Sequence, residues 1–455
     1  MDYLELIRSI DLQSFNVDFA DMRIEDKTAT IARIQNNDMT QAYEENNAGV
    51  FIRIYKKGRW YYTSLYKTDK DSITGALKDL ADYGRGEGKP GIPFWELIEP
   101  SEAGLMNNVN KRHAHSIKEK TELIKNYNSI MEKHDSIKVS STSYIDKYSA
   151  LYYANSAGSS YSYDFYGNEV RLGYTMVKGS EQFDGHFKQY GDEFSQLHGL
   201  EDSIEEEIEE TSLFVNAPKV EAGEFPVILS PDAAGVFAHE SFGHKSEADF
   251  MLGDKKMREE WKIGKEVGSK MLSIVDTGLI EGTSGYAPFD DEGTPGTKTY
   301  LIKNGILSGR LHSLITASAL EEKPTGNGRA ITTEFEPIVR MTSTFIEEGD
   351  STFDELVSGI DKGVYIKKIK HGSGLSTFTI APLKSYMIRD GKLAEPVKVN
   401  VITGNVFKTL NLIDGLSDEL RINSSLMGGC GKMEQFPLRV SFGGPEVRVS
   451  KMNVN

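Results

Sequence analysis

The sequence predicts an α+β fold of two domains, and three observations lead to this prediction. The chain has 455 residues, a length at which two or three domains are expected. In the first half, strand-like pairs are followed by helical segments, which favours a mixed α/β domain with an antiparallel sheet over residues 1–215. In the second half, many short strands bounded by glycine-rich turns favour a largely β domain over residues 216–455, with a few helices.

The first expected elements are a β-hairpin and a helix. Residues 49–55 and 59–66 are rich in β-branched and aromatic side chains, and the Lys-Lys-Gly segment between them is typical of a short turn. A helix is expected over residues 72–83, because three apolar residues recur there on one stripe. The glycine and proline content of residues 84–93 then predicts a loop.

A capping box predicts a second helix, and strands follow it. Ser116 and Glu119 have the spacing at which the two residues cap each other, so a helix is expected from there to about residue 134. Apolar and polar residues alternate over residues 138–145 and 160–165, which predicts antiparallel strands. The acidic run at residues 201–210 ends this half. We interpret it as a solvated helix face rather than as a site for a cation or a basic partner.

The second half is predicted to open with a strand that leads into a helix. Residues 225–229 form an apolar run. Ser230 is a good helix N-cap, Pro231 fits the first helical position, and Asp232 lies where the helix dipole favours negative charge. Further strands are expected at residues 299–302, 398–402 and 438–442.

Composition limits the kind of protein that the chain can be. The formal net charge of −16 is opposite in sign to a nucleic-acid-binding surface, so no direct contact with nucleic acid is expected. No signal peptide is visible at the amino terminus, and no stretch approaches the ~18 apolar residues of a membrane span. A single cysteine excludes internal disulfides and fits a reducing compartment. The sequence therefore predicts a cytoplasmic protein.

The most informative pattern lies in residues 236–245. His239 and His244 flank Glu240 at a spacing of i, i+5. On a regular α-helix this spacing separates the two rings by about 140°, whereas the i, i+4 spacing of the familiar zinc-protease helix separates them by about 40°. Both imidazoles reach one metal ion if the helix carries an extra residue as a π-bulge. We therefore predict an irregular helix near Gly243.

A third metal ligand is predicted at the single cysteine. A catalytic zinc site usually has three protein ligands and an open position for water. Cys430 has a glycine on each side, which leaves its sulfur uncrowded. We predict that His239, His244 and Cys430 bind Zn²⁺ and that Glu240 is the general base that takes a proton from the zinc-bound water. In the alternative interpretation, the histidines are ordinary surface or core residues and the cysteine is a small buried hydrophobe.

These residues resemble the motifs of the TldD/PmbA family, zinc metallopeptidases once named as modulators of DNA gyrase. The metal-binding TldD branch carries His-Glu-x-x-x-His on a helix and a distant Gly-x-Cys-Gly-Lys, which His239, Glu240, His244 and Cys430 match. The PmbA branch lacks the histidine motif, so this chain resembles the TldD branch. Further blocks similar to the family, in family order, are residues 289–295, 301–305, 325–329, 402–405 and 443–448.

The resemblance implies a zinc-dependent metallopeptidase that acts on unfolded peptides. It implies that peptides bind as an added β-strand through main-chain hydrogen bonds. Such binding gives low sequence specificity, because the backbone is the same in every substrate. It also implies a dimer, either a homodimer or a heterodimer with a metal-free paralogue of the PmbA/TldE type, whose cleft excludes folded proteins.

Two other functions stay open at this point. One is a non-catalytic peptide-binding or assembly protein with a structural zinc, which would have four protein ligands and no open water position. The other is a small-molecule amidohydrolase. The substitution Glu240→Gln separates a peptidase, which loses turnover and keeps its metal, from a binding protein, which keeps its peptide binding.

Several other patterns are interpreted as structural. Asp276-Thr-Gly matches an aspartic-protease triplet, but that chemistry needs a second carboxylate from a second copy, so a turn is expected. The run Asp290, Asp291 and Glu292 could hold a second metal or line the cleft, but the glycine, threonine and proline that follow favour a turn. Four isolated histidines are treated as non-ligands, namely His113, His115, His312 and His371.

Overall fold

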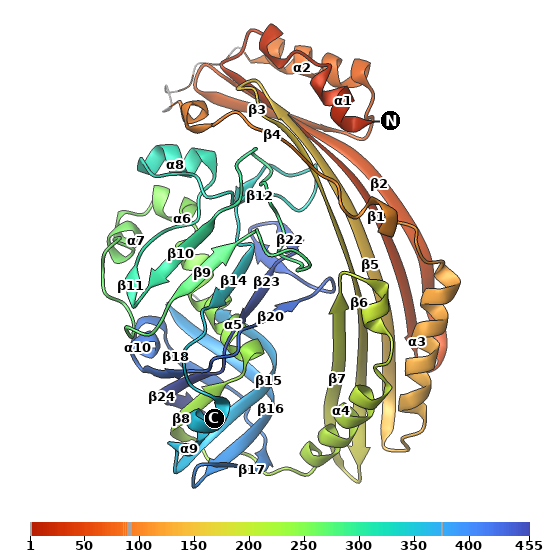
Figure 1. The fold of residues 1–455 in the computed structure, drawn as a ribbon, viewed down its shortest axis with the longest axis vertical. Helices are drawn as coiled ribbons and strands as arrows, with labels where there is room; N and C mark the ends of the chain where they lie inside the picture. The colour runs from red at the N-terminus through yellow and green to blue at the C-terminus, as the bar shows by residue number, and fades with distance from the viewer. Residues whose placement is uncertain (1, 85, 87, 89–92, 375) are drawn as a thin grey trace.

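The computed structural model describes residues 2–84, 86, 88, 93–374 and 376–455, and it confirms the α+β class. The loop predicted at residues 84–93 lies largely outside the described residues. Figure 1 shows a long curved sheet built by the first half of the chain and a β-rich body, built by the second half, on the concave side of that sheet.

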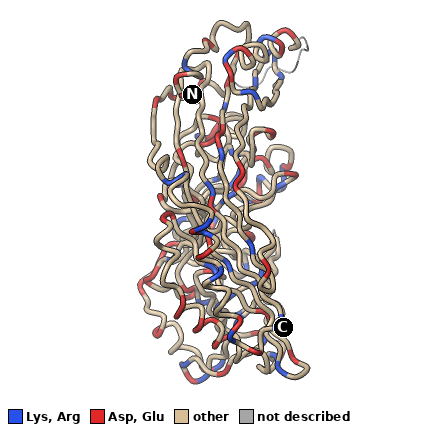
Figure 2. The backbone as a smooth tube through the Cα atoms, turned by 90° about the vertical axis from the view of Figure 1, so that its right-hand side faces the viewer, with Lys and Arg blue, Asp and Glu red and all other residues tan. Residues whose placement is uncertain are grey.

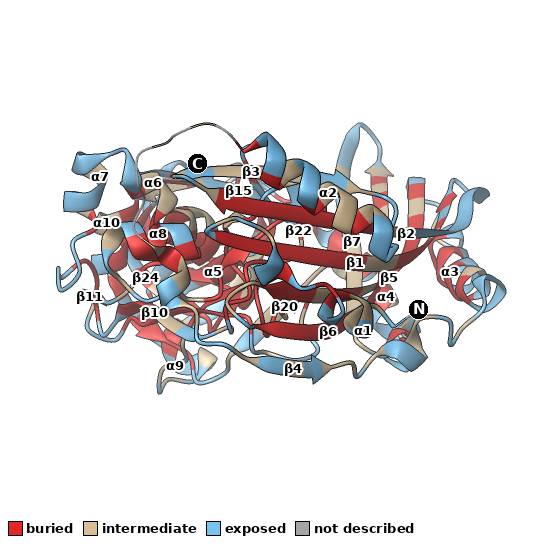
Figure 3. Ribbon diagram, turned by 90° about the horizontal axis from the view of Figure 1, so that it is seen from above, coloured by how far each residue is buried: buried red, intermediate tan, exposed pale blue. Residues whose placement is uncertain are grey.

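The first half builds a seven-stranded, largely antiparallel sheet. Its order is β3-β2-β1-β5-β6-β4, and β7 also pairs with β6. Strands β1, β5 and β6 are 17 to 19 residues long and buried over most of their length (Figure 3). The strands are β1 Phe19–Gln35, β2 Asp38–Lys56, β3 Arg59–Leu65, β4 Glu102–Leu105, β5 Ile137–Asn155, β6 Ser160–Lys178 and β7 Glu181–Gly191.

The predicted hairpin and helices are present. Strands β2 and β3 join through Lys57 and Gly58, whose φ angles of 50° and 77° suit the tight turns between twisted strands. Helix α3 begins with the predicted capping box of Ser116 and Glu119. Helices α1 and α2 pack on one end of the sheet, and α3 and α4 pack on the other (Figure 1). The helices are α1 Tyr3–Arg8, α2 Lys70–Tyr83, α3 Ile117–Glu132 and α4 Glu201–Phe214.

The interpretation of the acidic run as a solvated face is wrong for two of its carboxylates. Glu207 is only 7% exposed and forms an ion pair with Lys384 at 2.5 Å. Burial opposes the charged form of Glu210, but hydrogen bonds from Lys367 and Tyr386 outweigh it and lower the pKa of Glu210 to about 2. These partners lie 157 to 177 residues later in the chain, so the local sequence gives no sign of them. The cluster fastens α4 to the β-rich body.

The second half contains a sheet and a closed barrel. The six-stranded sheet has the order β11-β10-β9-β14-β23-β20. Strands β15, β8, β24, β18 and β16 close into a barrel, because β15 pairs with both β8 and β16. The strands are β8 Gly223–Leu229, β9 Ile274–Thr277, β10 Lys298–Lys303, β11 Ile306–Leu307, β12 Gly328–Arg329, β13 Ile338–Val339, β14 Ser343–Ile346, β15 Lys362–Gly374, β16 Thr377–Arg389, β17 Lys392–Val397, β18 Ile402–Asn405, β19 Ile413–Leu416, β20 Arg421–Ser424, β21 Cys430–Lys432, β22 Gln435–Leu438, β23 Ser441–Gly444 and β24 Val447–Val454.

Helix α5 lies between this sheet and the barrel, within a large apolar core that both supply. Gly235 of α5 meets the backbone of β23 so closely that an added Cβ would lie 2.5 Å from the amide nitrogen of Gly443. Only glycine permits this approach, which holds the helix against the sheet. The helices of this half are α5 Pro231–Ala238, α6 Asp249–Leu252, α7 Lys255–Glu260, α8 Leu314–Leu320, α9 Phe353–Ser358 and α10 Val406–Asn411.

Two predicted strands have other bounds in the structure. Lys398 forms only an isolated bridge with Lys219, and the strand begins at Ile402. The strand predicted over residues 438–442 is divided between β22 and β23, with Arg439 and Val440 in neither. The reason is that β22 pairs with β21 whereas β23 pairs with β14 and β20, so the chain leaves one sheet and enters another.

The prediction of a turn at Asp276 is wrong. This residue lies inside β9 and is 1% exposed. Its carboxylate accepts hydrogen bonds from the backbone N–H of Thr342 at 2.9 Å, the hydroxyl of Thr344 at 2.7 Å and the side-chain amide of Asn327 at 2.9 Å. A carboxylate can be buried in a strand when its oxygens are satisfied in this way.

The turn predicted at residues 290–292 is present, and it is buried between the two halves of the molecule. Asp291 forms an ion pair with Arg23 at 3.2 Å, and Glu292 forms one with Arg53 at 2.9 Å. Arg23 and Arg53 belong to β1 and β2 of the long sheet. The turn is therefore a second ionic contact that fixes the β-rich body against the sheet.

Charge is distributed along the whole molecule. Figure 2 shows acidic and basic residues interspersed from one end to the other. In the part of the chain that the structure describes, no helix combines the length and the apolar character needed to cross a membrane.

Candidate metal centre

The predicted irregular helix is confirmed. Ser230 caps α5 by accepting a hydrogen bond from the N–H of Ala233 at 3.3 Å, and Pro231 takes the first helical position. The α-helix ends at Ala238 and continues as a π-helical turn over His239–Gly243. A π-turn closes hydrogen bonds from i to i+5, so residues five apart come to one face. The two imidazole rings, His239 and His244, accordingly lie 5.1 Å apart at an angle of 80°.

Gly243 is required where it stands in this turn. A Cβ added to it would overlap the sulfur of Met341, a fully buried residue of the core. The absence of a side chain at this position therefore lets the π-turn pack against its neighbours. This is the residue that the sequence indicated as the place of the irregularity.

Cys430, the predicted third ligand, lies beside the two histidines. Its sulfur is 3.5 Å from Nε2 of His244, and the ligand atoms of His239, His244 and Cys430 all lie within 4.8 Å of one another. Gly429, with a φ of 156°, allows the chain to approach the backbone of Leu438 more closely than a side chain would permit. Gly429 thus lets the chain bring Cys430 next to His239 and His244.

The electrostatics of the cluster favour a thiolate. Burial opposes ionisation of Cys430, but the charge of His239 and hydrogen bonds from both histidines outweigh it and lower the pKa of the thiol to about 5. Burial likewise disfavours the charged form of His244, but hydrogen bonds to Cys430 and Glu247 raise the pKa of this imidazole to about 10. A thiolate is the form of cysteine that binds metals.

This donor set fits zinc. Zinc bond lengths of about 2.0–2.3 Å place tetrahedral ligands about 3.3–3.6 Å apart, and the separation of 3.5 Å between Cys430 and His244 falls in that range. Nδ1 of His239 is buried without a hydrogen-bond partner among the described residues. A buried ring nitrogen in that state is costly unless something binds it. Two imidazoles and one thiolate also leave one position of a tetrahedral site open.

A layer of charged residues behind the cluster was not predicted from the sequence. Oε2 of Glu247 lies 3.2 Å from Nδ1 of His244, and the side chain of Glu247 is fully buried. Lys432, two residues after the cysteine, pairs with Glu247 at 3.0 Å and with Asp249 at 2.7 Å. With Nδ1 donating to Glu247, Nε2 of His244 is free to face the cysteine. The spacing of Glu247 three residues after His244 was the available signal.

We expect Glu247→Gln to weaken zinc affinity about 10- to 100-fold, the usual effect of losing such a supporting carboxylate. Glutamine keeps the size of the side chain but removes the charge that holds His244 and Lys432. Competition with a chromogenic chelator measures the affinity, and Glu259→Gln on the exposed face of α7 is the matched control. Unchanged affinity in Glu247→Gln would show that this carboxylate does not orient the ligand.

Glu240 lies at a small cavity next to the cluster. The cavity has a volume of about 90 Å³, enough for a few water molecules. Glu240 is half-buried. Two glycines of β15 pack against it, since a Cβ added at Gly372 would lie 3.6 Å from its Cγ and one at Gly374 would lie 3.2 Å from its carbonyl oxygen. The cavity is lined by Val236, His239, Glu240, Ser425, Gly429, Cys430, Val440 and Phe442.

The four histidines treated as non-ligands lie outside the cluster. His312 is buried, with its ring nitrogens bonded to Thr316 and Glu322. His115 stacks on Phe194 at 4.2 Å. Within the described ranges, His239, His244 and Cys430 form the one grouping of such side chains with the spacing of a metal site.

Three models of one protein family match the chain. PmbA/TldA metallopeptidase domain 1 matches residues 20–82, the central domain matches residues 113–213, and the C-terminal domain matches residues 222–455. The last of these contains every residue of the cluster.

Several metalloproteases and one solved structure are similar to this chain over about half of its length or more. A metalloprotease of Synechocystis sp. is 32% identical over 95% of this chain and 93% of its own length. A zinc metalloprotease TldD homolog of Saccharolobus solfataricus is 35% identical over 51% of this chain and 52% of its own length. The crystal structure of TldE from Thermococcus kodakarensis has a TM-score of 0.79 at 17% identity and covers 96% of this chain and 97% of that one, so the two share a fold.

Proposed function

Because this chain belongs to the PmbA/TldD metallopeptidase family, we propose that it is a zinc-dependent peptidase that hydrolyses unfolded peptides with low sequence specificity. One observation carries the proposal. The ligand atoms of His239, His244 and Cys430 lie within 4.8 Å of one another, beside a cavity that Glu240 also lines. A metal site with an open position and an adjacent carboxylate is the arrangement that metal-assisted hydrolysis of a peptide bond uses.

In the proposed mechanism, different residues bind the metal, orient a ligand and transfer the proton. His239, His244 and Cys430 would hold the ion, and Glu247 would orient the ring of His244. Bound zinc would polarise the scissile carbonyl and lower the pKa of the attacking water. Glu240 acts as the general base that takes the proton from that water, and then as the acid that gives it to the leaving amine.

The long sheet supports the proposal that peptides bind as an added strand. Strand β2 pairs with β3 only from Val50 to Lys56. Residues 38–49 of β2 therefore keep one edge free of any strand partner in the described part of the chain, and most of them are exposed. Such an edge pairs with the main chain of an extended peptide and does not read its side chains.

We also propose that the working form is a dimer, with a second copy or with a metal-free paralogue. The shared fold with TldE supports a paralogue as a candidate partner. Sedimentation and peptidase assays of the purified chain alone separate the cases. A dimer means self-association, an inactive monomer favours a paralogue as partner, and an active monomer contradicts the proposed dimer.

Removal of the metal tests the proposed function directly. We expect about one zinc per chain, loss of hydrolysis of an extended peptide after chelation, and recovery when zinc is returned. A folded protein with the same amino-acid composition as the extended peptide should resist cleavage. A chain that contains zinc but cleaves neither peptides nor small amides, before or after zinc is returned, would instead be a binding protein.

A further inference from the structure

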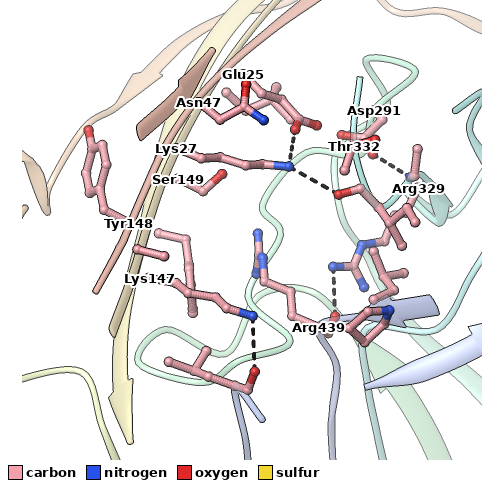
Figure 4. Close-up of a pocket in the computed structure, with 18 of the residues that line it drawn as sticks. Glu25, Lys27, Asn47, Lys147, Tyr148, Ser149, Asp291, Arg329, Thr332 and Arg439 are labelled. Carbon is pink, nitrogen blue, oxygen red and sulfur yellow. Dashed lines mark hydrogen bonds and ion pairs between the residues drawn. The ribbon is translucent and has the colours of Figure 1, made fainter. Parts of the chain in front are cut away.

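A second and larger cavity, of about 420 Å³, lies between the long sheet and the β-rich body (Figure 4). It is separated from the metal cluster by a short length of chain. Cys430 pairs with Leu438 across β21 and β22, and Leu438 lines the larger cavity whereas Cys430 lines the smaller one. Arg439, next to Leu438, therefore reaches a point on the order of 10 Å from the cluster, which an extended peptide spans with two or three residues.

Basic side chains converge on this cavity. Lys27, Lys147 and Arg439 point into it from opposite walls (Figure 4). Lys147 donates to the carbonyl of Leu426 at 3.1 Å, and Arg439 donates to the carbonyl of Ser284 at 3.1 Å. Over the described residues, neither Lys147 nor Arg439 has a carboxylate within ion-pair distance. Neither charge is therefore neutralised by a direct ion pair, although Glu45 and Glu169 act on Lys147 from farther away.

The acidic groups that line the same cavity have partners already. Glu25 forms ion pairs with Arg23 at 3.3 Å and with Lys27, and Asp291 forms one with Arg23 at 3.2 Å. Asp290 accepts backbone hydrogen bonds and is fully enclosed, and burial raises its pKa well above the ordinary value. Glu45 is exposed, on the free edge of β2. Lys147 and Arg439 are consequently two basic groups of this lining that we find available, without an ion pair among the described residues, for a bound anion.

We infer that this cavity is a subsite for a carboxylate of the peptide substrate, two or three residues from the scissile bond. The inference rests on the proposed peptidase function. Lys147 and Arg439 provide charge-assisted N–H donors for the two carboxylate oxygens, and Phe165 and Leu438 contribute apolar wall. Burial and the nearby Lys27 both lower the pKa of Lys147, and a bound anion would relieve that repulsion. Aspartate or glutamate side chains and the peptide's own carboxyl end present the same group.

The test is peptide binding to the zinc-loaded Glu240→Gln protein, which prevents turnover during the measurement. Fluorescent eight-residue peptides of alanine and valine carry one glutamate or one glutamine, moved along the chain, and end in a carboxylate or an amide. We expect a carboxylate at one position to bind about tenfold more tightly than its amide. The position of that carboxylate shows whether the cavity binds an acidic side chain within the peptide or the carboxylate at the end of the peptide.

Substitution of Lys147 distinguishes binding of the carboxylate in this cavity from non-specific electrostatic attraction of the peptide to the protein. Lys147→Gln should lose most of the preference for the carboxylate peptide, with Arg439 as the remaining donor, and Lys147→Arg should keep the preference. Lys178→Gln is the matched control, since Lys178 of β6 also donates to a carbonyl but lies outside the cavity. A preference that is undiminished in Lys147→Gln, or absent in the starting protein, overturns the inference. Hydrolysis by the unmutated chain is measured separately, so a peptidase without this preference and a carboxylate-binding protein without hydrolysis are distinguished.

Discussion

Substitution of Glu240 by glutamine is expected to lower kcat for peptide hydrolysis about 10²- to 10⁴-fold while the zinc content stays at that of the unmutated chain. Glutamine has the shape of glutamate but cannot accept a proton from water at neutral pH. The carboxylate does not belong to the three-residue cluster, so the ligands stay in place. It is also only half-buried, so its loss should affect stability little.

Two measurements check this expectation together. Steady-state kinetics on an extended peptide give kcat, and elemental analysis of the same preparation gives the metal. The exposed Glu221→Gln change, which removes an acid from a loop at the start of the second half, should alter neither. If Glu240→Gln turns over at the normal rate with zinc bound, another group takes the proton. If it loses its zinc, Glu240 is a ligand and the proposed division of roles is wrong.

The second large effect is expected at Cys430. Cys430→Ala should reduce bound zinc from about one per chain to nearly none, because two imidazoles alone bind zinc far more weakly than a site with a thiolate. The fold should survive. The cysteine is a small side chain at the border of a large apolar core, and its truncation costs on the order of 1 kcal/mol.

Thermal unfolding of the metal-free proteins separates the effect of losing zinc from the effect of truncating the cysteine side chain. The metal-free Cys430→Ala and unmutated proteins should unfold within a few degrees of each other, since neither gains stability from bound zinc. Met433→Ala, at an exposed position three residues away, is the control and should retain its metal. Equal zinc in Cys430→Ala and the unmutated chain would remove the cysteine from the metal site. Global unfolding of Cys430→Ala would make the zinc structural and favour a binding or assembly protein.

Signals that are local in the chain predicted the local structure. Ser230 and Pro231 mark the start of α5, Ser116 and Glu119 mark the start of α3, and the i, i+5 spacing of His239 and His244 required the π-turn that is present. In each case the few residues that form the feature are neighbours in the sequence, so their chemistry alone decides the conformation.

Features that depend on distant partners were missed. The acidic run looked solvated because Lys384 stands 177 residues away from Glu207, and Asp276 looked like a turn because Thr342 and Thr344 are 66 and 68 residues away. The cavity between the two halves has the same origin, since β1, β5 and the segment around Arg439 meet only in the folded molecule. Tertiary contacts overrode local preference at each of these sites.

The π-turn has a genetic consequence. It contains one residue more than the α-helical turn it replaces, so loss of a single codon between His239 and His244 would shorten their spacing to i, i+4 and allow a regular helix. The spacing of this motif and that of the familiar zinc-protease helix thus differ by one three-nucleotide insertion. The insertion is viable here because Gly243 has no side chain that would overlap the buried Met341. One codon therefore separates a π-turn with histidines at i and i+5 from a regular α-helix with histidines at i and i+4, and both arrangements present two histidines to one metal ion.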